Sequence, residues 1–474
     1  MRKVVSIALL SALLSNQALS ADVNGWKQRA VYQLVTDRFA KGSGDKSNCN
    51  LGAQPYYCGG DFDGIVANLQ YIKNLGFDAI WISPVVDNTD NGFHGYWARN
   101  WNKINDHFGG EDGLKRLIKA AHDMDIWVMV DVVANHVGPV GFDYSQIQPF
   151  NQPQHYHDNC DINDWGNQWQ VENCRLAGLP DLKQEDGWVR QQLKDWIKNL
   201  VSNYGFDGIR IDTIPEVPKD FWSEFGQASG VFQMGECFNG FSGYVGDYQN
   251  HLSALFNYPM YYSIRDSFAY GKSMRGISDR WNEEAKYFKD IDALGIFVDN
   301  HDNPRFLNSQ GDHRLFKSAL AFALTARGIP FFYYGSEQGF AGGQDPYNRE
   351  ALWNNLDQNS EIFKFVQTIL NARKHSQIWS HYFNEKYVDD QFYGFSKGDF
   401  FVALTNQLNG ETHRDVPNSG FSEGETVCNI FFAGDCITVK NGVLPIYLEN
   451  GEAKIFVPKN SSFFTSQKTE AFLE

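Results

Sequence analysis

After about residue 27 the chain alternates short apolar runs with longer amphipathic stretches, and this alternation constrains the fold more than any other feature. Short apolar runs bounded by turn residues are typical of buried strands, and strands that alternate with helices indicate a parallel sheet. The runs that qualify as strands are 31–39, 77–84, 126–133, 206–213, 231–238, 295–300 and 328–335. They are nearly the eight strands that close a (β/α)₈ TIM barrel. The sixth strand is hard to see, and we assign it to residues 255–262.

Two regions depart from this pattern. Residues 137–186 are rich in Asn, Asp, Gln, Gly and Pro and are too long for a simple connection, which predicts an inserted domain after the third strand. Beyond about residue 374 the runs become short, with Gly and Asn between them, which predicts a C-terminal all-β domain. We therefore expect an α/β barrel formed by residues 21–136 and 187–375, an inserted domain at 137–186, and a β domain at 376–474.

The N-terminus has the pattern of a secretory signal peptide at residues 1–20. Arg2 and Lys3 precede an apolar stretch at 4–14, and small residues follow at 18–20. No later segment approaches about 18 uninterrupted apolar residues, so we expect no membrane association and a secreted, extracellular protein. The net charge of −16 argues against nucleic acid as a partner and is compatible with a neutral substrate.

Seven cysteines in an exported protein indicate three disulfides and one free thiol. The close spacings predict the pairs Cys49 with Cys58, Cys160 with Cys174, and Cys428 with Cys436. Cys237 is then left as a small buried apolar residue on the fifth strand.

Three of the strand-like runs end in acidic residues, and this is the main clue to function. The segments are GIRID at 208–212, MGE at 234–236 and FVDNHD at 297–302. Carboxylates at the C-terminal ends of several barrel strands are typical of an active site. Two carboxyl groups in opposite protonation states can deliver a proton and supply an anion in the same reaction.

The neighbours of two of these acids predict which role each takes. Side chains alternate along a strand, so Arg210 and Asp212 point to the same side, where the arginine would lower the pKa of Asp212 and keep it ionised. Asp212 is therefore the nucleophile candidate. Glu236 has no cation beside it in the sequence, and two neighbouring aspartates would raise its pKa, which favours the role of acid.

Together with DVVANH at 131–136, these three segments resemble, in order, the four motif regions of glycoside hydrolase family 13, the α-amylase family. Any one of them alone is more often an ordinary ion pair or turn, whereas four in the right order are specific. The resemblance implies that Asp212 is the nucleophile, Glu236 the acid and base, and Asp302 the stabiliser of the distorted sugar.

Further segments extend the resemblance, especially to secreted fungal-type members. HGYW at 94–97 follows the second strand, and GGQDPYNRE at 342–350 follows the eighth. The alternatives are a core aromatic pair, histidines satisfied inside the barrel wall, and a surface ion pair. The substrate contacts that the resemblance implies are His94, Tyr96, Trp97, His136, Arg210, His301, Asp345 and Arg349.

The resemblance also implies a Ca²⁺ cofactor, since hard cations prefer several oxygen ligands. By position the side-chain ligands are Asn135, Glu172 and Asp181, and a backbone carbonyl ligand falls at Glu216. Each acid taken alone is as consistent with a solvated loop.

One segment departs from the fungal type. Pro215 and Glu216 stand where those enzymes carry Lys-His, which puts contacts on the leaving-group side of the cleft and the calcium carbonyl in question. A chloride site is also in question: Arg210 and Asn300 match two of its ligands, and the third, basic one has no match.

The sequence thus predicts a monomeric, retaining, endo-acting hydrolase of α-1,4-glucosidic bonds, with an α-glucan polysaccharide such as starch or glycogen as substrate. One alternative is another family member, namely a transglycosylase or an α-1,6- or exo-acting glucosidase. A second is a non-catalytic glucan-binding protein, against which the intact carboxylate trio argues.

Overall fold

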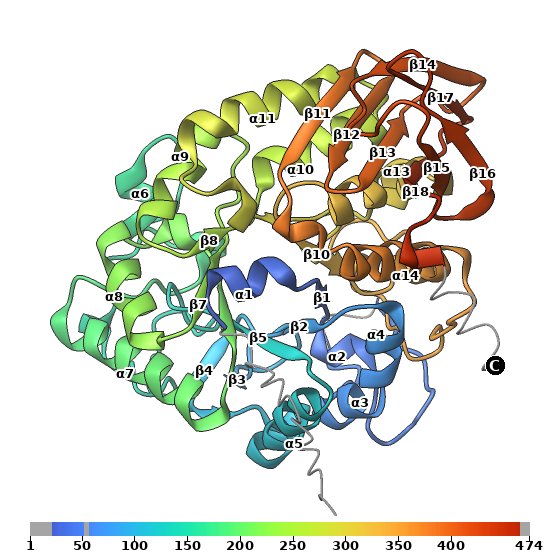
Figure 1. Cartoon of the computed structure of the whole chain (residues 1–474). Coiled ribbons are helices and arrows are strands. Elements are labelled where there is room, and N and C mark those ends of the chain that lie inside the picture. The colour runs from blue at the N-terminus through green and yellow to red at the C-terminus, as the bar shows by residue number, and fades with distance from the viewer. Residues whose placement is uncertain (1–20, 52–55, 465–474) are drawn as a thin grey trace, which may run out of the picture.

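The computed structural model describes residues 21–51 and 56–464, so the predicted signal peptide at 1–20 lies outside the described residues. At its centre is an eight-stranded parallel sheet in the order β8-β7-β6-β5-β2-β1-β10-β9 (Figure 1). Its strands are β1 (Val31–Gln33), β2 (Ala79–Ile82), β5 (Trp127–Val132), β6 (Gly208–Ile211), β7 (Phe232–Gly235), β8 (Ala254–Leu255), β9 (Gly295–Ile296) and β10 (Ile329–Tyr333).

The two edge strands of this sheet meet, which closes the barrel. Phe256, directly after β8, forms a parallel bridge with Gly295 of β9. The backbone N–H of Asn257 donates to the carbonyl of Gly295 at 2.8 Å. Because closure leaves no unpaired sheet edge, the predicted (β/α)₈ barrel is confirmed.

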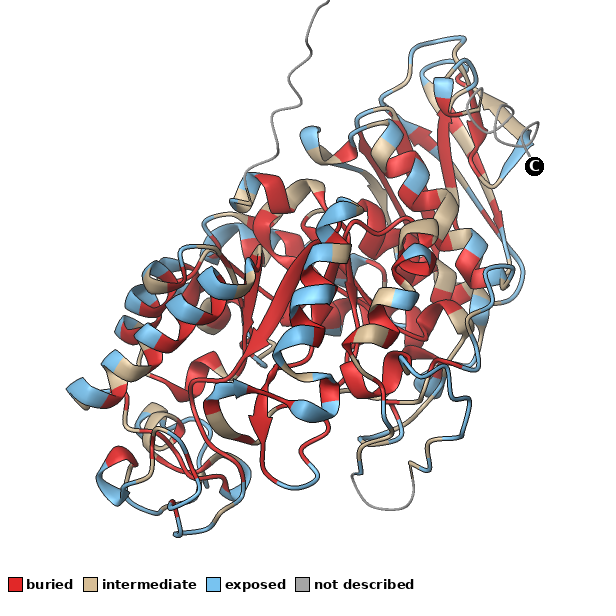
Figure 2. Ribbon diagram, turned by 90° about the horizontal axis from the view of Figure 1, so that it is seen from below, coloured by how far each residue is buried: buried red, intermediate tan, exposed pale blue. Residues whose placement is uncertain are grey.

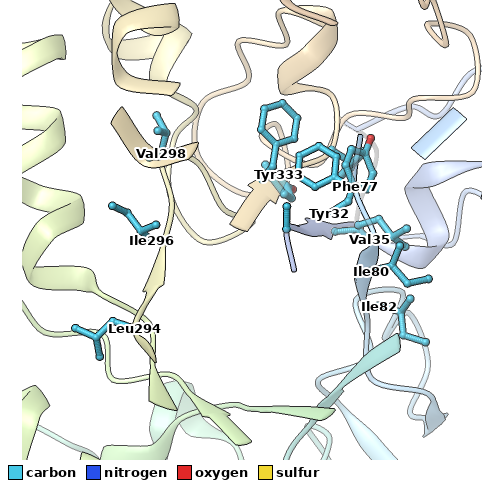
Figure 3. Close-up of a cluster of buried hydrophobic side chains, with 14 of the residues drawn as sticks. Tyr32, Val35, Phe77, Ile80, Ile82, Leu294, Ile296, Val298 and Tyr333 are labelled. Carbon is cyan, nitrogen blue, oxygen red and sulfur yellow. The ribbon is translucent and has the colours of Figure 1, made fainter. Parts of the chain in front are cut away.

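Alternating strand residues build two separate apolar layers. Ile80 and Ile82 of β2 point away from the barrel axis into the layer beneath the helices, as Ile296 of β9 does on the other side (Figure 3). Trp81 of the same strand belongs to a second cluster that fills the barrel interior. This period of two follows from the pleat and determines which side chains of each strand face the barrel mouth.

Helices surround the barrel with their buried faces inward (Figure 2). In α5, the buried residues Leu114, Leu117, Ile118 and Ala121 recur at helical spacing, which is why this segment forms an amphipathic helix. The helices are α1 (Val23–Gln28), α2 (Thr36–Phe39), α3 (Phe62–Ala67), α4 (Leu69–Leu75), α5 (Gly110–Asp123), α6 (Gln168–Asn173), α7 (Gly187–Tyr204), α8 (Lys219–Ser229), α9 (Ser242–Asp247), α10 (Tyr258–Ile264), α11 (Arg275–Tyr287), α12 (Phe306–Ser309), α13 (His313–Thr325) and α14 (Glu361–His375).

The prediction of the sixth strand was wrong for most of its length. The strand is only Ala254–Leu255, and residues 258–264 form helix α10. Asn257 caps this helix by accepting a hydrogen bond from the N–H of Met260, and Pro259 occupies the first turn, where its missing N–H costs nothing. A short apolar run does not distinguish a buried strand from a buried helix, which is why periodicity failed here.

The insertion and the C-terminus differ from the barrel in structure. The region between β5 and α7 contains α6 and the Cys160–Cys174 disulfide but little regular structure. The C-terminal region is all β, as predicted, and packs beside α13 (Figure 1). Its strands are β11 (Phe383–Val388), β12 (Phe392–Lys397), β13 (Phe400–Thr405), β14 (Glu411–Pro417), β15 (Thr426–Asn429), β16 (Phe432–Thr438), β17 (Val443–Glu449) and β18 (Lys454–Pro458), and a separate hairpin in the barrel region pairs β3 (Val86–Asn88) with β4 (Ala98–Ile104).

All three predicted disulfides are confirmed, and Cys237 is a buried free thiol. Within residues 21–51 and 56–464, no helix is long and apolar enough to cross a membrane. The residue limits of the three predicted domains stay predictions.

Candidate active site

Asp212 and Glu236 directly follow the neighbouring strands β6 and β7. Ile209 and Ile211 are buried in the outer apolar layer, so Arg210 and Asp212 turn to the barrel mouth. Parallel pairing sets Arg210 beside Met234, which brings the residues that follow, Asp212 and Glu236, to the same edge. With Asp302 they line a pocket of about 400 Å³. The structure therefore brings together the three predicted catalytic carboxyl groups.

One buried guanidinium holds three acids. Arg210 Nη1 lies 2.7 Å from Asp212 Oδ1 and 2.9 Å from Asp131 Oδ1, and Arg210 Nη2 lies 2.8 Å from Glu236 Oε1. The pair with Asp212 agrees with the prediction from strand alternation. The pair with Glu236 does not: this acid has a cation after all, supplied by the adjacent strand rather than by its own sequence neighbours.

The pKa of Glu236 nevertheless lies well above its ordinary value. Burial contributes most, the positive charge of Arg210 opposes it, and the negative charges of Asp302 and Asp212 raise the pKa further. Desolvation and like charges thus outweigh the single cation. The raised pKa favours the protonated form of Glu236, the state that a proton donor requires.

Sequence reasoning missed Tyr258, which positions Glu236. Its hydroxyl donates to Glu236 Oε1 at 3.1 Å and accepts from Asn300 Nδ2 at 2.9 Å. The signal for it was the cap Asn257 with Pro259, which marks a helix start, and not a strand, at this place.

Asp131 is a second residue to which the sequence assigned no role. It lies within β5, pairs with Arg210, and accepts hydrogen bonds from the Tyr96 hydroxyl at 2.7 Å and from Trp81 Nε1 at 3.2 Å. Burial raises its pKa to about 7, with Arg210 opposing. An acid inside an otherwise apolar strand was the available signal.

Tyr96 and His301 form the centre of a polar wall on one side of the trio. The hydroxyl of Tyr96 lies 2.6 Å from His301 Nε2, and the two rings stack with centroids 5.5 Å apart. Gln33 Nε2 lies 2.6 Å from His301 Nδ1, an arrangement that fits a neutral imidazole protonated on Nε2. Burial lowers the pKa of His301 well below its ordinary value, with the charge of Arg349 adding to the effect.

The remaining predicted sugar contacts surround this wall. The backbone N–H of Tyr96 donates to His94 Nδ1 at 3.0 Å, and His136 Nε2 lies 3.2 Å from the carbonyl of Tyr96. Trp97 packs edge-on against His94. Burial lowers the pKa of both His94 and His136, so all three histidines of the wall are neutral.

Arg349 joins the wall to Asp302. Its Nη2 lies 3.6 Å from Asp302 Oδ1, its Nε lies 3.2 Å from Asp345 Oδ1, and its Nε also donates to the carbonyl of His301 at 3.0 Å. Asp345 is the exposed member of this group. The segment after β10 therefore reaches the predicted place at the cleft.

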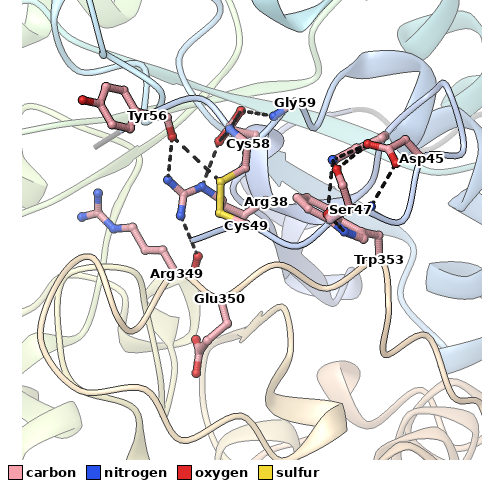
Figure 4. The surroundings of a disulfide bond; sticks show 12 residues. Arg38, Asp45, Ser47, Cys49, Tyr56, Cys58, Gly59, Arg349, Glu350 and Trp353 are labelled. Carbon is pink, nitrogen blue, oxygen red and sulfur yellow. Dashed lines mark hydrogen bonds and ion pairs between the residues drawn. A yellow bond between two sulfur atoms is a disulfide. The ribbon is translucent and has the colours of Figure 1, made fainter. Parts of the chain in front are cut away.

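Arg38 connects Arg349 to the segment that the Cys49–Cys58 disulfide closes (Figure 4). Arg38 donates to the carbonyl of Arg349 at 3.3 Å and to the carbonyl of Tyr56 at 3.2 Å. Tyr56 lies between Cys49 and Cys58, which are bonded to each other. Arg38 thus ties this disulfide-closed segment to the segment after the last barrel strand.

The comparisons with known proteins agree with this geometry. The family model described as "Alpha amylase, catalytic domain" matches residues 33–413. The chain belongs to the alpha-amylase family. It is therefore a glycoside hydrolase, as the four motifs predicted.

Individual relatives cover the chain to different extents. An alpha-amylase of Saccharomycopsis fibuligera is 38% identical over 96% of this chain and 97% of its own length. A beta/alpha-amylase of Paenibacillus polymyxa is also 38% identical over 94% of this chain, which spans only 39% of that longer protein. The structure of an alpha-amylase from Malbranchea cinnamomea has a TM-score of 0.89 and 36% identity, covering 93% of this chain and 98% of that one.

Three of the four predicted calcium ligands of this alpha-amylase family member converge. The side-chain amide oxygen of Asn135 faces Asp181 Oδ1 and the backbone carbonyl of Glu216, each 3.0 Å away; rotated by 180°, the amide would instead donate to both. Oxygens that face one another fit a hard cation between them. Within the described residues, no three His, Cys, Asp or Glu side chains form a metal cluster. The three oxygens here come from an amide, a backbone carbonyl and only one such side chain, Asp181, so they do not make a cluster of that kind.

Glu172, the fourth predicted ligand, makes a different contact. It is half-buried on α6 and accepts from Gln168 Nε2 at 2.8 Å, which also donates to the carbonyl of Pro215 at 2.9 Å. Glu172 is therefore tied to the segment beside Glu216, without joining the three converging oxygens.

The pocket extends from the trio in a second direction, opposite in character to the polar wall. Pro215 and Glu216 lie in a single turn of 3₁₀ helix at 214–216 and line this side, with the exposed rings of Trp165 and Phe238. Sequence reasoning missed both aromatic residues. Phe238 was recognisable as an aromatic residue two positions after Glu236, whereas Trp165 lies in the irregular insertion, where position along the chain says little about location.

Proposed function

We propose that this alpha-amylase family member cleaves internal α-1,4-glucosidic bonds of starch- and glycogen-type glucans with retention of anomeric configuration. The observation that carries the proposal is the sharing of Arg210 between Asp212 and Glu236 at the barrel mouth. Two carboxyl groups held by one cation, one of them with a strongly raised pKa, form the pair that a retaining glycosidase uses.

In the first step, protonated Glu236 donates its proton to the glycosidic oxygen as that bond breaks. Asp212, paired with Arg210, attacks the anomeric carbon through a carboxylate oxygen and forms a covalent glycosyl-enzyme ester. In the second step, Glu236, now a carboxylate, takes a proton from water while the water oxygen attacks the same carbon and releases Asp212. Asp302, paired with Arg349, stabilises the positive charge and distortion of the sugar ring.

The polar wall supplies the contacts of the sugar that reacts with Asp212. On the family resemblance, neutral His136 and His301 contact sugar hydroxyls, for which a ring nitrogen of each would exchange its present protein partner, and the flat face of Tyr96 packs on the sugar ring. His94, Trp97, Asp345 and Arg349 complete this side. The aromatic side of the pocket, which adjoins Glu236, then receives the leaving group.

We also propose that a calcium ion is held by Asn135, Asp181 and the carbonyl of Glu216, with Glu172 as a further ligand on the family resemblance. Bound there, the ion would join the end of β5, the insertion and the turn after β6. The ion would help to position His136 and Asp212. Asn135 directly precedes His136, and Glu216 follows Asp212 in the segment after β6.

The disulfides and the net charge support a proposal about where the protein acts and on what. Three disulfides fit an oxidising compartment, which supports a secreted, extracellular protein released by cleavage of residues 1–20. A neutral glucan as substrate agrees with the net charge of −16. We propose that the protein acts as a monomer, with no nucleic acid or membrane as partner.

The test is the product profile from soluble starch, combined with NMR of the fresh hydrolysate. We expect a fall in polymer length before small sugars accumulate, and the α-anomer as the first product. Release of a single small sugar from the start would indicate an exo-acting enzyme, and products longer than a supplied short substrate would indicate a transglycosylase. A β-anomer formed first would contradict the retaining mechanism.

A further inference from the structure

Exposed aromatic rings continue outward from the leaving-group side of the pocket. Phe238, which lines the pocket, is 53% exposed, and beyond it lie Tyr262, Phe241 and Tyr287, with exposed fractions of 39%, 56% and 46%. Single exposed aromatic residues are ordinary on protein surfaces. Four that follow one another from an active site require an explanation.

The four rings lie on the loop after β7 and on the two neighbouring helices α10 and α11. Phe238 packs against Tyr258 with ring centroids 4.6 Å apart, and Tyr262 lies one helical turn further along α10. Phe241 and Tyr287 have centroids 5.9 Å apart, where the loop after β7 meets the end of α11.

Two glycines allow these rings to lie close to the backbone. A Cβ on Gly240 would come within 3.0 Å of the Tyr262 ring. A Cβ on Gly243 would come within 2.8 Å of the Phe241 ring and 3.2 Å of the Tyr287 ring. Gly240 therefore lies against the Tyr262 ring, and Gly243 against the rings of Phe241 and Tyr287, with no side chain between.

Arg280 of α11 holds the loop that carries the row. Its Nη1 donates to the carbonyl of Gly240 at 3.3 Å and to Ser242 Oγ at 3.1 Å, and its Nε donates to Ser263 Oγ at 3.2 Å. The loop is thus attached to both α10 and α11 by hydrogen bonds within the protein. Such preorganisation lowers the entropic cost of binding to the row.

We propose that Tyr262, Phe241 and Tyr287 form a binding track for the leaving-group part of a long α-glucan, beyond the sugars that Phe238 contacts. The occupant is identified by the position of the row next to Phe238, which lines the pocket. A polymer cleaved inside the pocket leaves it past Phe238 and meets this row. Aromatic faces pack against the apolar faces of sugar rings, and no charge is required of the ligand. The inference rests on the proposed function, because it assigns the aromatic side to the leaving group.

The test compares long and short substrates in single variants of exposed residues, Phe241→Ser and Tyr287→Ser. For each, kcat/KM is measured on soluble starch and on maltotriose, which is too short to reach the row from the cleavage site. We expect the starch-to-maltotriose ratio to fall roughly threefold to tenfold per ring, the size of a lost aromatic contact. Tyr382→Ser, which removes a 90% exposed tyrosine at the start of the C-terminal domain, is the matched control and should leave the ratio unchanged.

A binding measurement separates this inference from catalysis. In a Glu236→Gln background, which cannot turn over the ligand, titration calorimetry with maltoheptaose and retardation in starch-containing gels should both weaken on adding Phe241→Ser. If the wild-type enzyme fails to cleave starch, the proposed function falls. If it cleaves starch but neither the ratio nor the retardation changes in the variants, only the binding track is overturned. A wild-type dimer in sedimentation that Phe241→Ser converts to a monomer would assign the row to a second copy and also overturn the track.

Discussion

The polar wall and the aromatic side of the cleft differ in burial and in the residues that form them. In the polar wall around Tyr96 and His301, the histidine is buried and the tyrosine partly buried, and the hydrogen-bonding atoms lie 2.6–3.2 Å apart. The opposite side presents exposed rings such as Trp165 and Phe238, with Pro215 and Glu216 in place of the Lys-His of the fungal type. The reacting sugar needs fixed geometry, whereas the departing chain needs a surface that tolerates variation. On the proposed function, the first side would hold the reacting sugar and the second the leaving part of the chain.

Removing either member of the carboxyl pair should abolish hydrolysis, whichever side of the cleft binds the substrate. Asp212→Asn and Glu236→Gln are each expected to lower starch hydrolysis by at least roughly 10³-fold, because each eliminates one step of the double displacement. Thermal melting should show a folded protein. Substantial residual turnover in a folded variant would mean that the wrong residue had been assigned, and Asp158→Asn, an exposed acid of the insertion, should retain full activity.

The pH dependence should report Glu236 directly. Because its pKa is raised, the acid form persists to higher pH than in an ordinary glutamic acid, and kcat should fall as pH rises through that pKa, because the acid form is lost. We expect the alkaline limb of the kcat–pH profile to lie well above the ordinary pKa of a glutamic acid. A profile that declines from about pH 4.5 upward, near the usual range for this residue, would contradict the assignment.

Calcium removal should loosen the junction between the two sides. Asn135 lies beside His136 of the polar wall and Glu216 lies on the aromatic side, so one ion would hold both. Chelation should lower the melting temperature and restored calcium should recover it, since a ligand at 100 times its Kd stabilises the folded state by about 2.7 kcal/mol.

The control for this measurement is metal content. Elemental analysis should find calcium in the wild-type protein and in Asp158→Asn, and less of it in Asn135→Ala. A melting curve unchanged by exhaustive chelation, with no metal found, would remove the site.

The smallest expected effect concerns Pro215 and Glu216, where donors of the fungal type are replaced. We expect the wild-type enzyme to cleave starch well but to be poor on short maltooligosaccharides and in transglycosylation, which needs an acceptor on this side. Pro215→Lys with Glu216→His should raise kcat/KM on short substrates by roughly twofold to tenfold, the size of one net hydrogen bond, and the starch rate by less. Equal effects on both substrates, or none, would show that these positions do not contact the leaving group.

Much of the fold was predictable because it rests on local pattern. Alternating apolar runs and amphipathic stretches predicted the barrel, and close cysteine spacing predicted all three disulfides. The exception was the sixth strand, where an apolar run of aromatic residues forms helix α10 instead. There the cap residue Asn257 and the following Pro259 mark a helix start, which periodicity does not detect.

By itself, the sequence determined which acids end the barrel strands, because alternation along a strand and the order of the strands are local properties. The tertiary structure alone decided how those acids are coupled. Arg210 reaches Asp131 across 79 residues of sequence, Tyr258 joins Glu236 from a helix mistaken for a strand, and Tyr96 meets His301 across 205 residues. Parallel strands bring distant residues to one edge only after the sheet has closed, so the shared cation, and with it the tuning of Glu236, appears only in the folded barrel.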